Sequence, residues 1–581
     1  MIIRIILGIM YLFLTLYLGS SFSKKYFKLK GLKSVVSGFI CLNFIIAFIA
    51  FMLAIIFGSN INFLNTLISV LIVFLSIREL PKIRFKNILK EILRNKIILI
   101  FSILIFVIYF FNFSGPFLGY WDTYIAAPSI TMAGTQLNFV DINNETLYNY
   151  TLLQKIPNDL INKKSYGIIS KDQRISSGIL MSVPFLFFGI FGFRLFYSFF
   201  IVSGFFILYF LVNLITKSKT ISLIASALCY MNGYIFSINT LNPNLFGMIL
   251  LTLIIYLSLL NVKNWFIIGL LFGILGSIRN IAIIFSFGMF FYLITEEKSI
   301  KKITIFTLAT ILGIIPILYW NNFAFGNMFM HSSQYSFFEG YRPEFSHNIF
   351  NLKFMFNGLF NFPLNNEIIR TPHYTYPVYI YLFLLLKKTF GLFLVFPILG
   401  YFNFYKKNKR NTLFIGLLFI PLFLLLSFQE NWEVAKTSFI LLCFPQIIIF
   451  LSKGLEELKK NWLNPIYHTK LGILIIILVL ISTFTISQNY ELDQRWYERF
   501  PKAAADSYNK YENKIDLDEF KFFQSKETIK ELNSQKEFLD KTYLPFLKMP
   551  SKNRINISNE LKKENINVFV IWKYIYVDIK N

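Results

Sequence analysis

One carboxylate of the chain stands where it could do acid–base chemistry at the edge of a membrane. Asp122 lies in the motif Gly119-Tyr-Trp-Asp-Thr-Tyr124, which follows the apolar run of residues 97–112 and opens a long polar loop. Partial desolvation raises the pKa of a carboxylate and suits it to accept a proton from a hydroxyl. A structural interpretation stands beside this one, because Trp and Tyr gather at membrane interfaces and Asp also caps helices.

Aromatic residues adjoin this carboxylate and recur in a second polar loop. Rings beside polar groups suit stacking on a sugar, although an aromatic belt at the interface gives the same pattern. The candidate substrate-binding residues are Trp121, Tyr124, His373, Tyr374 and Tyr376. No HxH or HExxH spacing occurs, so a divalent metal is possible but has no support from motifs, and no metal ligand is assigned.

A second candidate is a cation between two apolar segments. Arg279 separates residues 265–276 from residues 281–295, which we expect to form a hairpin with Arg279 near its outward tip. A guanidinium in such a place needs an anionic partner, and a lipid phosphate fits its planar fork of donors. A buried ion pair or snorkelling to the interface explains it equally well. Arg174 is a weaker case of the same kind.

The composition is that of a polytopic membrane protein. The 581 residues are 55% hydrophobic and 15% charged, with a mean hydropathy of +0.57. Apolar runs of roughly 17–25 residues recur, each long enough to cross a bilayer. The net charge of +26 does not indicate nucleic acid, because the basic residues cluster in short segments between apolar runs. Cys41, Cys229 and Cys443 lie inside apolar segments, as small core residues do.

Basic clusters orient the spans, because cytoplasmic loops gather Lys and Arg. The segments 24–33 and 78–96 are basic, so we place the N-terminus and Asp122 outside. About fourteen crossings are expected, with short helices lying along the outer interface. After three N-terminal spans they are residues 97–112, 194–216, 221–238, 245–260, the hairpin 265–295, 303–320, 391–405, 413–428, 436–451 and 471–486.

Three regions follow from this layout. Residues 1–96 form a three-span N-terminal region, and residues 97–486 form a transmembrane module with external loops over 113–193 and 321–390. Residues 487–581 form a small extracytoplasmic α/β appendage, in which the β-branched and aromatic run 567–577 reads as a strand.

Several short motifs and the layout agree with one known class. An acid lies just after a span at Asp122, Gln173 to Arg194 leads into the next span, and Gly273-Ile-Leu-Gly276-Ser-Ile-Arg279 is a glycine-rich stretch ending in a cation. Residues 97–451 thereby resemble the GT-C class of polyprenyl-phosphate-sugar-dependent glycosyltransferases, in the branch of protein O-mannosyltransferases and lipid-A aminoarabinose transferases.

The resemblance implies an inverting transfer of a sugar from a polyprenyl-phosphate donor to a hydroxyl of a glycan, lipid or protein at the outer face. Asp122 would be the base, while Arg279 and Arg174 would bind the lipid phosphate. The absence of P-loop and dinucleotide motifs fits a donor that carries its own activation. A lipid-linked-oligosaccharide flippase or other transporter is the alternative, and a scaffold that presents the C-terminal region is a third possibility.

Overall fold

A computed structural model describes the helical part of the chain and a few short strands. The described residues are 2–57, 96–111, 190–231, 243–325 (without 261 and 263), 395–428, 441–462, the single positions 180 and 328, and the strand residues given below.

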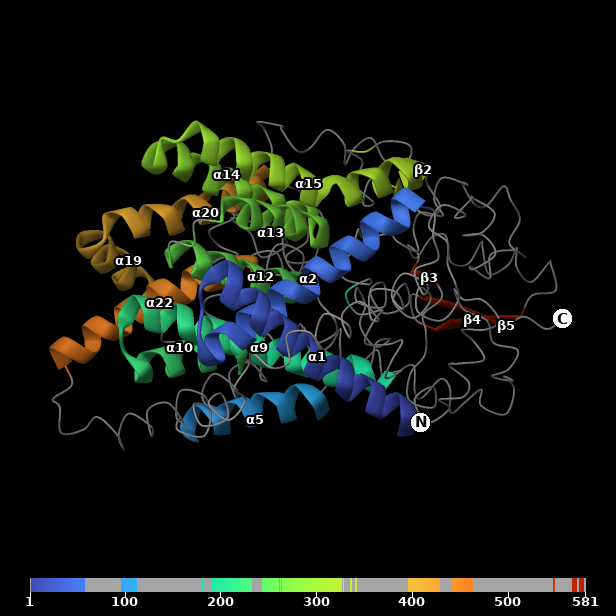
Figure 1. Ribbon diagram of the computed structural model, residues 1–581, viewed down its shortest axis with the longest axis horizontal. Coiled ribbons are helices and arrows are strands. Elements are labelled where there is room, and N and C mark those ends of the chain that lie inside the picture. Colours follow the sequence, from blue (N-terminus) through green and yellow to red (C-terminus); the bar gives the residue numbers. More distant parts are fainter. Residues whose placement is uncertain are drawn as a thin grey trace, which may run out of the picture.

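Twelve α-helices form the described core of the fold (Figure 1). They are α1 (Ile2–Phe27), α2 (Gly31–Phe57), α5 (Lys96–Phe111), α9 (Ile190–Thr216), α10 (Lys219–Tyr230), α12 (Pro243–Leu259), α13 (Trp265–Ile278), α14 (Ile284–Tyr292), α15 (Ile300–Phe325), α19 (Val395–Lys407), α20 (Lys409–Phe428) and α22 (Phe444–Trp462). Shorter 3-10 turns are η5 (Asn280–Ile283) and η11 (Leu441–Cys443), and η6 (Leu293–Glu297) is a π-turn.

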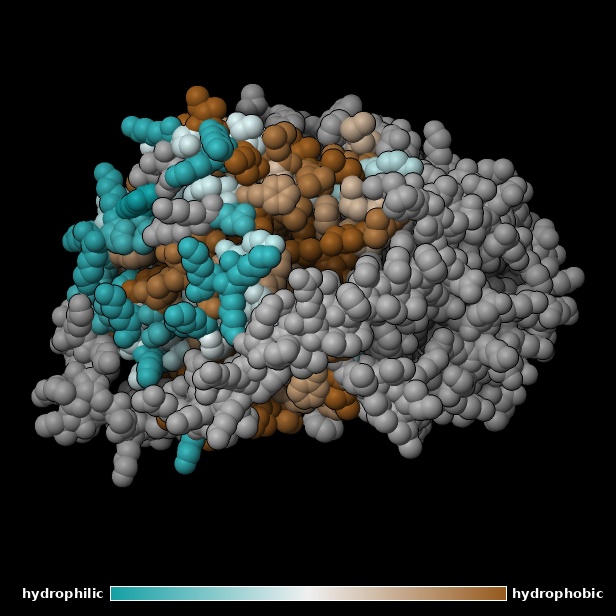
Figure 2. Space-filling model, in the orientation of Figure 1, coloured by the Kyte–Doolittle hydropathy of each residue, from teal (hydrophilic) through white to brown (hydrophobic). Residues whose placement is uncertain are grey.

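The hydrophobic surface of this bundle suits a lipid environment. Three described helical segments are long and apolar enough to cross a membrane: Gly31–Leu53, Leu195–Thr216 and Ile300–Tyr319. Large apolar side chains are exposed on α5, α15 and α19, as at Ile100 (61%), Leu308 (62%) and Phe402 (58%). Figure 2 shows apolar side chains over much of the described surface beside a hydrophilic end. The prediction of a helical protein is therefore confirmed, and it has three described helices that are long and apolar enough to cross a membrane.

The basic segments within the described part of the chain meet at one end of the bundle, which we call the basic end. Lys33 lies with its Nζ 5.9 Å from the ring of Phe210 in α9, and Lys453 Nζ donates to Ile215 O of α9 at 3.0 Å. Arg410 Nε donates to the Tyr292 hydroxyl at 2.9 Å. Segments expected on the cytoplasmic side are thus neighbours, and Figure 2 shows their hydrophilic side chains gathered together.

Glycine residues allow the backbones of α13 and α15 to pack in direct contact. A Cβ on Gly273 would lie 2.3 Å from Thr310 O and 2.6 Å from Gly313 Cα. A Cβ on Gly269 would likewise lie 2.4 Å from Phe306 O. Only glycine permits such an approach, which is a common way for apolar helices to associate without a hydrophobic driving force.

Several helices extend beyond the apolar runs from which they were expected. α9 begins at Ile190, inside the first loop expected over 113–193, and α15 reaches Phe325, inside the second loop expected over 321–390. α22 continues to Trp462, well past the expected end at residue 451. Hydropathy detects the lipid-facing part of a helix, whereas backbone hydrogen bonds continue into the polar water-facing turns.

Other expected elements lie outside the described residues. They are the third N-terminal span, the last span over 471–486, the interfacial loop helices and most of the appendage. Within residues 567–577, expected as one strand, the chain forms two: β4 (Asn567–Ile571) and β5 (Tyr574–Asp578) pair antiparallel with Val570 opposite Ile575. The remaining described strands are β3 (Leu547–Lys548), which pairs with β5, and the pair β1 (Tyr335–Ser336) and β2 (Gly340–Tyr341).

Candidate functional site

Arg279 stands at the break between two short apolar helices. Its backbone is extended, with φ −146° and ψ 109°, which ends α13. Its N–H still donates to Leu275 O at 3.1 Å, and its carbonyl accepts from Ala282 N at 2.8 Å, so the turn into η5 is fully hydrogen-bonded on both sides. The side chain is half-buried. The expected hairpin therefore exists, with Arg279 at its turn.

Arg279 lies at the opposite end of α13 from the basic end. Trp265 begins this 14-residue helix, and Lys302 Nζ lies 5.9 Å from its ring. At a rise of about 1.5 Å per residue, the helix carries Arg279 roughly 20 Å away from these cations. We call this opposite side of the bundle the outer end.

The helix break at Arg279 also lies inside the bundle, before the level at which the long helices end. Ser277 Oγ donates to Gly313 O at 2.8 Å, so the last turn of α13 is level with Gly313 of the parallel helix α15. α15 continues twelve residues beyond Gly313, to Phe325. At about 1.5 Å per residue this is on the order of 15 to 18 Å. Arg279 is thus placed well inside the depth that the long helices span.

Other helices begin or end at the same level as the end of α13. A Cβ on Gly247, in the second turn of α12, would lie 2.7 Å from Leu442 of η11 and 3.4 Å from Leu275 of α13. The outer ends of α12, α13 and α22 are therefore neighbours. α10 packs against both α9 and α22 and has its outer end at Tyr230.

Buried polar groups gather near these helix ends. Gln446, one turn after Leu442, is fully buried, and neither its amide nitrogen nor its amide oxygen has a hydrogen-bond partner within the described part of the chain. The hydroxyl of Tyr230 is also buried without a partner there, and it lies against Gly204 of α9, where a Cβ would meet it at 2.5 Å. Buried amides are rarely left without partners, so Gln446 marks a place where a ligand or water would bind.

The C-terminal end of α5, which precedes Asp122 in the sequence, is fixed to the same end. The hydroxyl of Tyr109, in the last turn of α5, donates to Tyr230 O at 3.0 Å. This bond satisfies one of the C-terminal carbonyls of α10, which have no partner within their own helix. Asp122 follows Phe111 by eleven residues, which extended chain can stretch to roughly 36 Å.

That length would be sufficient to bring the two predicted site residues together. α5 contacts α9, α9 contacts α12, and α12 contacts α13. Three steps between neighbouring helices of about 8 to 10 Å each amount to at most roughly 30 Å. A shared site for Asp122 and Arg279 is therefore compatible with the reach of the chain.

The remaining predicted site residues lie outside the described residues. These are Asp122, Trp121, Tyr124, Arg174, His373, Tyr374 and Tyr376. Of the glycine-rich stretch before Arg279, Gly273 packs against α15, and a Cβ on Gly276 would lie 2.9 Å from Ile283 Cδ1. These glycines permit close packing and shape the turn.

Among the described residues no group of three acids, histidines and cysteines could hold a metal, and Cys41, Cys229 and Cys443 are buried core residues as expected.

Sequence reasoning did not single out Gln446, Tyr109 or Tyr230. Gln446 interrupts the apolar run of residues 439–451, and a polar amide in such a run is the signal that could have found it. The two tyrosines gave no comparable signal, because their pairing joins segments far apart in the chain.

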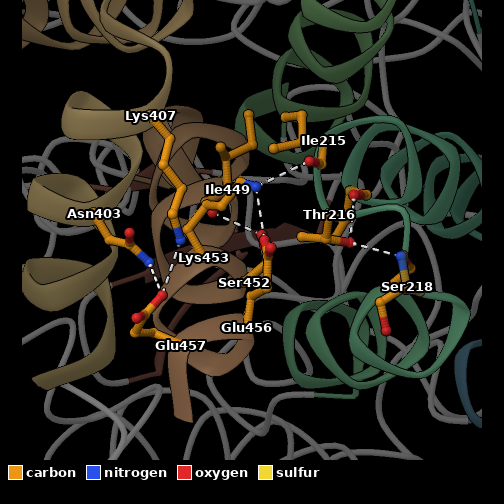
Figure 3. Close-up of polar contacts among 12 residues, drawn as sticks. Ile215, Thr216, Ser218, Asn403, Lys407, Ile449, Ser452, Lys453, Glu456 and Glu457 are labelled. Atoms are coloured by element: carbon orange, nitrogen blue, oxygen red, sulfur yellow. Dashed lines mark hydrogen bonds and ion pairs between the residues drawn. The ribbon is translucent and has the colours of Figure 1, made fainter. Parts of the chain in front are cut away.

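A polar network at the basic end is structural in character (Figure 3). Lys453 is 6% exposed and donates to Ile215 O at 3.0 Å and to Glu456 Oε2 at 2.7 Å. Lys407 and Asn403 of α19 both donate to Glu457 Oε2. A cation at the C-terminus of α9 compensates its last carbonyls, so the network holds α9, α19 and α22 together.

Comparison with protein-family models, with curated protein sequences and with solved structures finds no match to this chain. The inference of function therefore rests on the residues and their geometry.

Proposed function

We propose that the chain is an integral membrane glycosyltransferase that moves a sugar from a polyprenyl-phosphate donor to a hydroxyl acceptor on the extracytoplasmic side. The observation that carries the proposal is the position of Arg279, a half-buried cation at a helix break inside the bundle depth and remote from the basic end. A cation there suits the phosphate of a lipid whose chain lies in the bilayer.

The reaction inverts the anomeric centre. The acceptor oxygen attacks the anomeric carbon, its proton passes to the Asp122 carboxylate, and the bond from that carbon to the phosphate oxygen breaks. The leaving polyprenyl phosphate gains one negative charge, which the guanidinium of Arg279 stabilises, with Arg174 as a second cation. Trp121, Tyr124, His373, Tyr374 and Tyr376 would line the sugar subsite.

The proposal includes a topology of about fourteen crossings with the outer end extracytoplasmic. The clustering of Lys and Arg at the opposite end supports this orientation by the rule that cytoplasmic loops are positive. A single introduced cysteine tests it, because Cys41, Cys229 and Cys443 are buried and should not react. Thr220→Cys, at an exposed position of the basic end, should react with a membrane-impermeant maleimide only after the membrane is opened. Reaction in sealed cells would reverse the orientation.

The decisive experiment measures release of polyprenyl phosphate from a panel of polyprenyl-phosphate hexoses by purified protein in lipid nanodiscs, with a cell-envelope extract added as the source of acceptor hydroxyls. This product forms whatever the sugar and the acceptor are. Asp122→Asn should lower turnover at least about 1,000-fold while the protein remains folded, and Asp141→Asn, a matched change in the same loop, should leave it within about twofold. Arg279→Gln should lower turnover more than Arg279→Lys, which keeps the charge. Full turnover by Asp122→Asn would eliminate the mechanism.

A lipid-linked-oligosaccharide flippase or other transporter is the second candidate. The broken pair α13 and α14 and the buried amide of Gln446 favour it, because transporters bind substrates at interrupted helices and polar groups inside the bilayer. Movement of an intact donor lipid across the bilayer of a proteoliposome, without release of polyprenyl phosphate, would select this function.

A further inference from the structure

Lysines surround the turn between α1 and α2, at the basic end of the bundle. Residues 24–33, which we call the lysine turn, have the sequence Lys-Lys-Tyr-Phe-Lys-Leu-Lys-Gly-Leu-Lys. Their apolar members Phe27, Leu29 and Leu32 are buried and fix the turn to the bundle. The four exposed lysines of the turn are Lys25, Lys28, Lys30 and Lys33.

The backbone of the lysine turn is well defined. Lys28 and Gly31 are both left-handed, with φ of 57° and 61°, and they reverse the chain between the two helices. Beside the turn, Ser20 Oγ and Ser34 Oγ form a hydrogen bond of 2.9 Å that joins α1 to α2. The positions from which the lysines project are therefore fixed.

The charges of these lysines are not neutralised within the described part of the chain. Lys25 Nζ lies 5.3 Å from the ring of Tyr26, and Lys33 Nζ lies 5.9 Å from the ring of Phe210. An aromatic ring attracts an ammonium group but does not neutralise its charge. Among the described residues none of the lysines of the turn forms an ion pair, and neither α1 nor α2 contains an acid.

The four acids of the described helices lie on other elements. Glu456 and Glu457 of α22 are each paired with a lysine of α22 or α19. Glu296 and Glu297 belong to η6, which packs against α14 and α15. Four exposed cations on one turn, without an acid in either of its helices, are complementary to an anionic partner.

The position of the lysine turn indicates which anion that is. The segment Gly31–Leu53 of α2 is long and apolar enough to cross a membrane, and its 23 residues extend about 34 Å against a hydrocarbon core of about 30 Å. Its first residues belong to the lysine turn, so in a membrane the four lysines would lie at one edge of this core. Tyr26 is 41% exposed there, as aromatic residues at membrane interfaces are. Phospholipid head groups lie at the same level.

We propose that the lysine turn binds the head group of an anionic phospholipid in the leaflet at the basic end of the bundle. Ammonium groups donate charge-assisted hydrogen bonds to phosphate oxygens, and clustered lysines beside a membrane-crossing helix favour anionic lipids. Because α2 contacts α9, α12, α13 and α15, a bound lipid would hold this part of the bundle at the level of that leaflet. The proposal does not depend on glycosyl transfer.

The test uses the full-length protein purified in detergent and titrated with dioleoyl phosphatidylglycerol or dioleoyl phosphatidylcholine, with binding followed by native mass spectrometry. The anionic lipid should bind at least about tenfold more tightly than the zwitterionic one. The combined change Lys25→Gln, Lys28→Gln and Lys30→Gln should weaken its binding about tenfold or more, because three cations are lost. The same three positions changed to Arg keep the charge, and binding should stay within about threefold. Absence of a preference for the anionic lipid would refute the proposal.

A matched control removes the same charge elsewhere at the basic end. Lys298, Lys406 and Lys409 are exposed and lie after η6 and around the turn between α19 and α20. Their combined change to Gln should alter binding less than twofold, because a lipid held by the lysine turn touches none of them. If the two triple variants weaken binding equally, the attraction is a diffuse surface charge and the site is overturned.

Two measurements on the unchanged protein do not depend on how the variants fold. Phosphatidylglycerol with a photoreactive group on its head group should label residues 22–34, and labelling confined to other segments would contradict the site. A short DNA duplex tests the other class of polyanion. Tight binding of the duplex that phosphatidylglycerol fails to displace would assign the lysine turn to nucleic acid and overturn the lipid site.

Discussion

Tyr109 and Tyr230 are joined by a hydrogen bond of 3.0 Å from the hydroxyl of the first to the carbonyl of the second, across 121 residues of sequence. The bond holds the end of α5, from which the loop with Asp122 departs, to the end of α10. It is buried on both sides, so water cannot replace it.

We expect Tyr109→Phe to lower the free energy of unfolding by about 1 to 2 kcal/mol, because the buried carbonyl of Tyr230 loses its donor. The measurement is unfolding of the detergent-solubilised protein. Tyr256→Phe is the control: its hydroxyl is buried without a partner within the described residues, so its removal should be neutral or slightly stabilising. Equal losses in the two variants would show that the hydrogen bond contributes nothing specific.

The contact between α13 and α15 gives a second prediction. Gly273→Ala should strongly destabilise the protein, by several kcal/mol, because the new Cβ would meet the backbone of Thr310 and Gly313 and push the helices apart. Gly416→Ala in α20 meets nothing within 4 Å and should stabilise by up to about 1 kcal/mol through helix propensity. Thermal unfolding compares them, and a harmless Gly273→Ala would contradict the close packing.

The two lysines of the basic-end network should differ in their effects. Lys453→Met should cost roughly 3 kcal/mol, because it leaves Glu456 and the carbonyl of Ile215 without their buried cation. Lys407→Met should cost at most about 1 kcal/mol, since its pair with Glu457 is 42% and 38% exposed. Equilibrium unfolding measures both, and the reverse order would mean that burial does not set the strength of these pairs.

Local signals explain what could be predicted from the sequence. Long apolar runs predicted the helices, and the basic clusters between them predicted that their polar ends gather on one side of the bundle. An Arg between two short apolar segments predicted the turn at Arg279. The pairing of Tyr109 with Tyr230 could not be predicted, because it depends on packing between segments far apart in the chain. The packing role of Gly273 against α15 was hidden for the same reason. Hydropathy also located α22 but not its polar extension to Trp462.

Gln446 allows stability and function to be separated. Its amide is fully buried, and both of its polar atoms lack partners within the described residues, which costs about 1 to 3 kcal/mol if nothing binds there. Gln446→Leu, of similar volume, should therefore raise the midpoint of thermal unfolding. Retention of a costly polar group is expected where it serves a ligand, because binding sites often reduce stability.

The same substitution should lower turnover with polyprenyl-phosphate hexoses at least about tenfold if the amide binds the donor or acceptor, since a hydrogen bond within a desolvated site is lost. Gln446→Glu tests whether the site needs a polar group at this position. This variant keeps acceptor oxygens but adds a negative charge, which should repel an anionic lipid phosphate. A Gln446→Leu variant that is more stable and fully active would identify the residue as an unfavourable core position. A variant that is less stable would show that the amide has a partner in the folded protein.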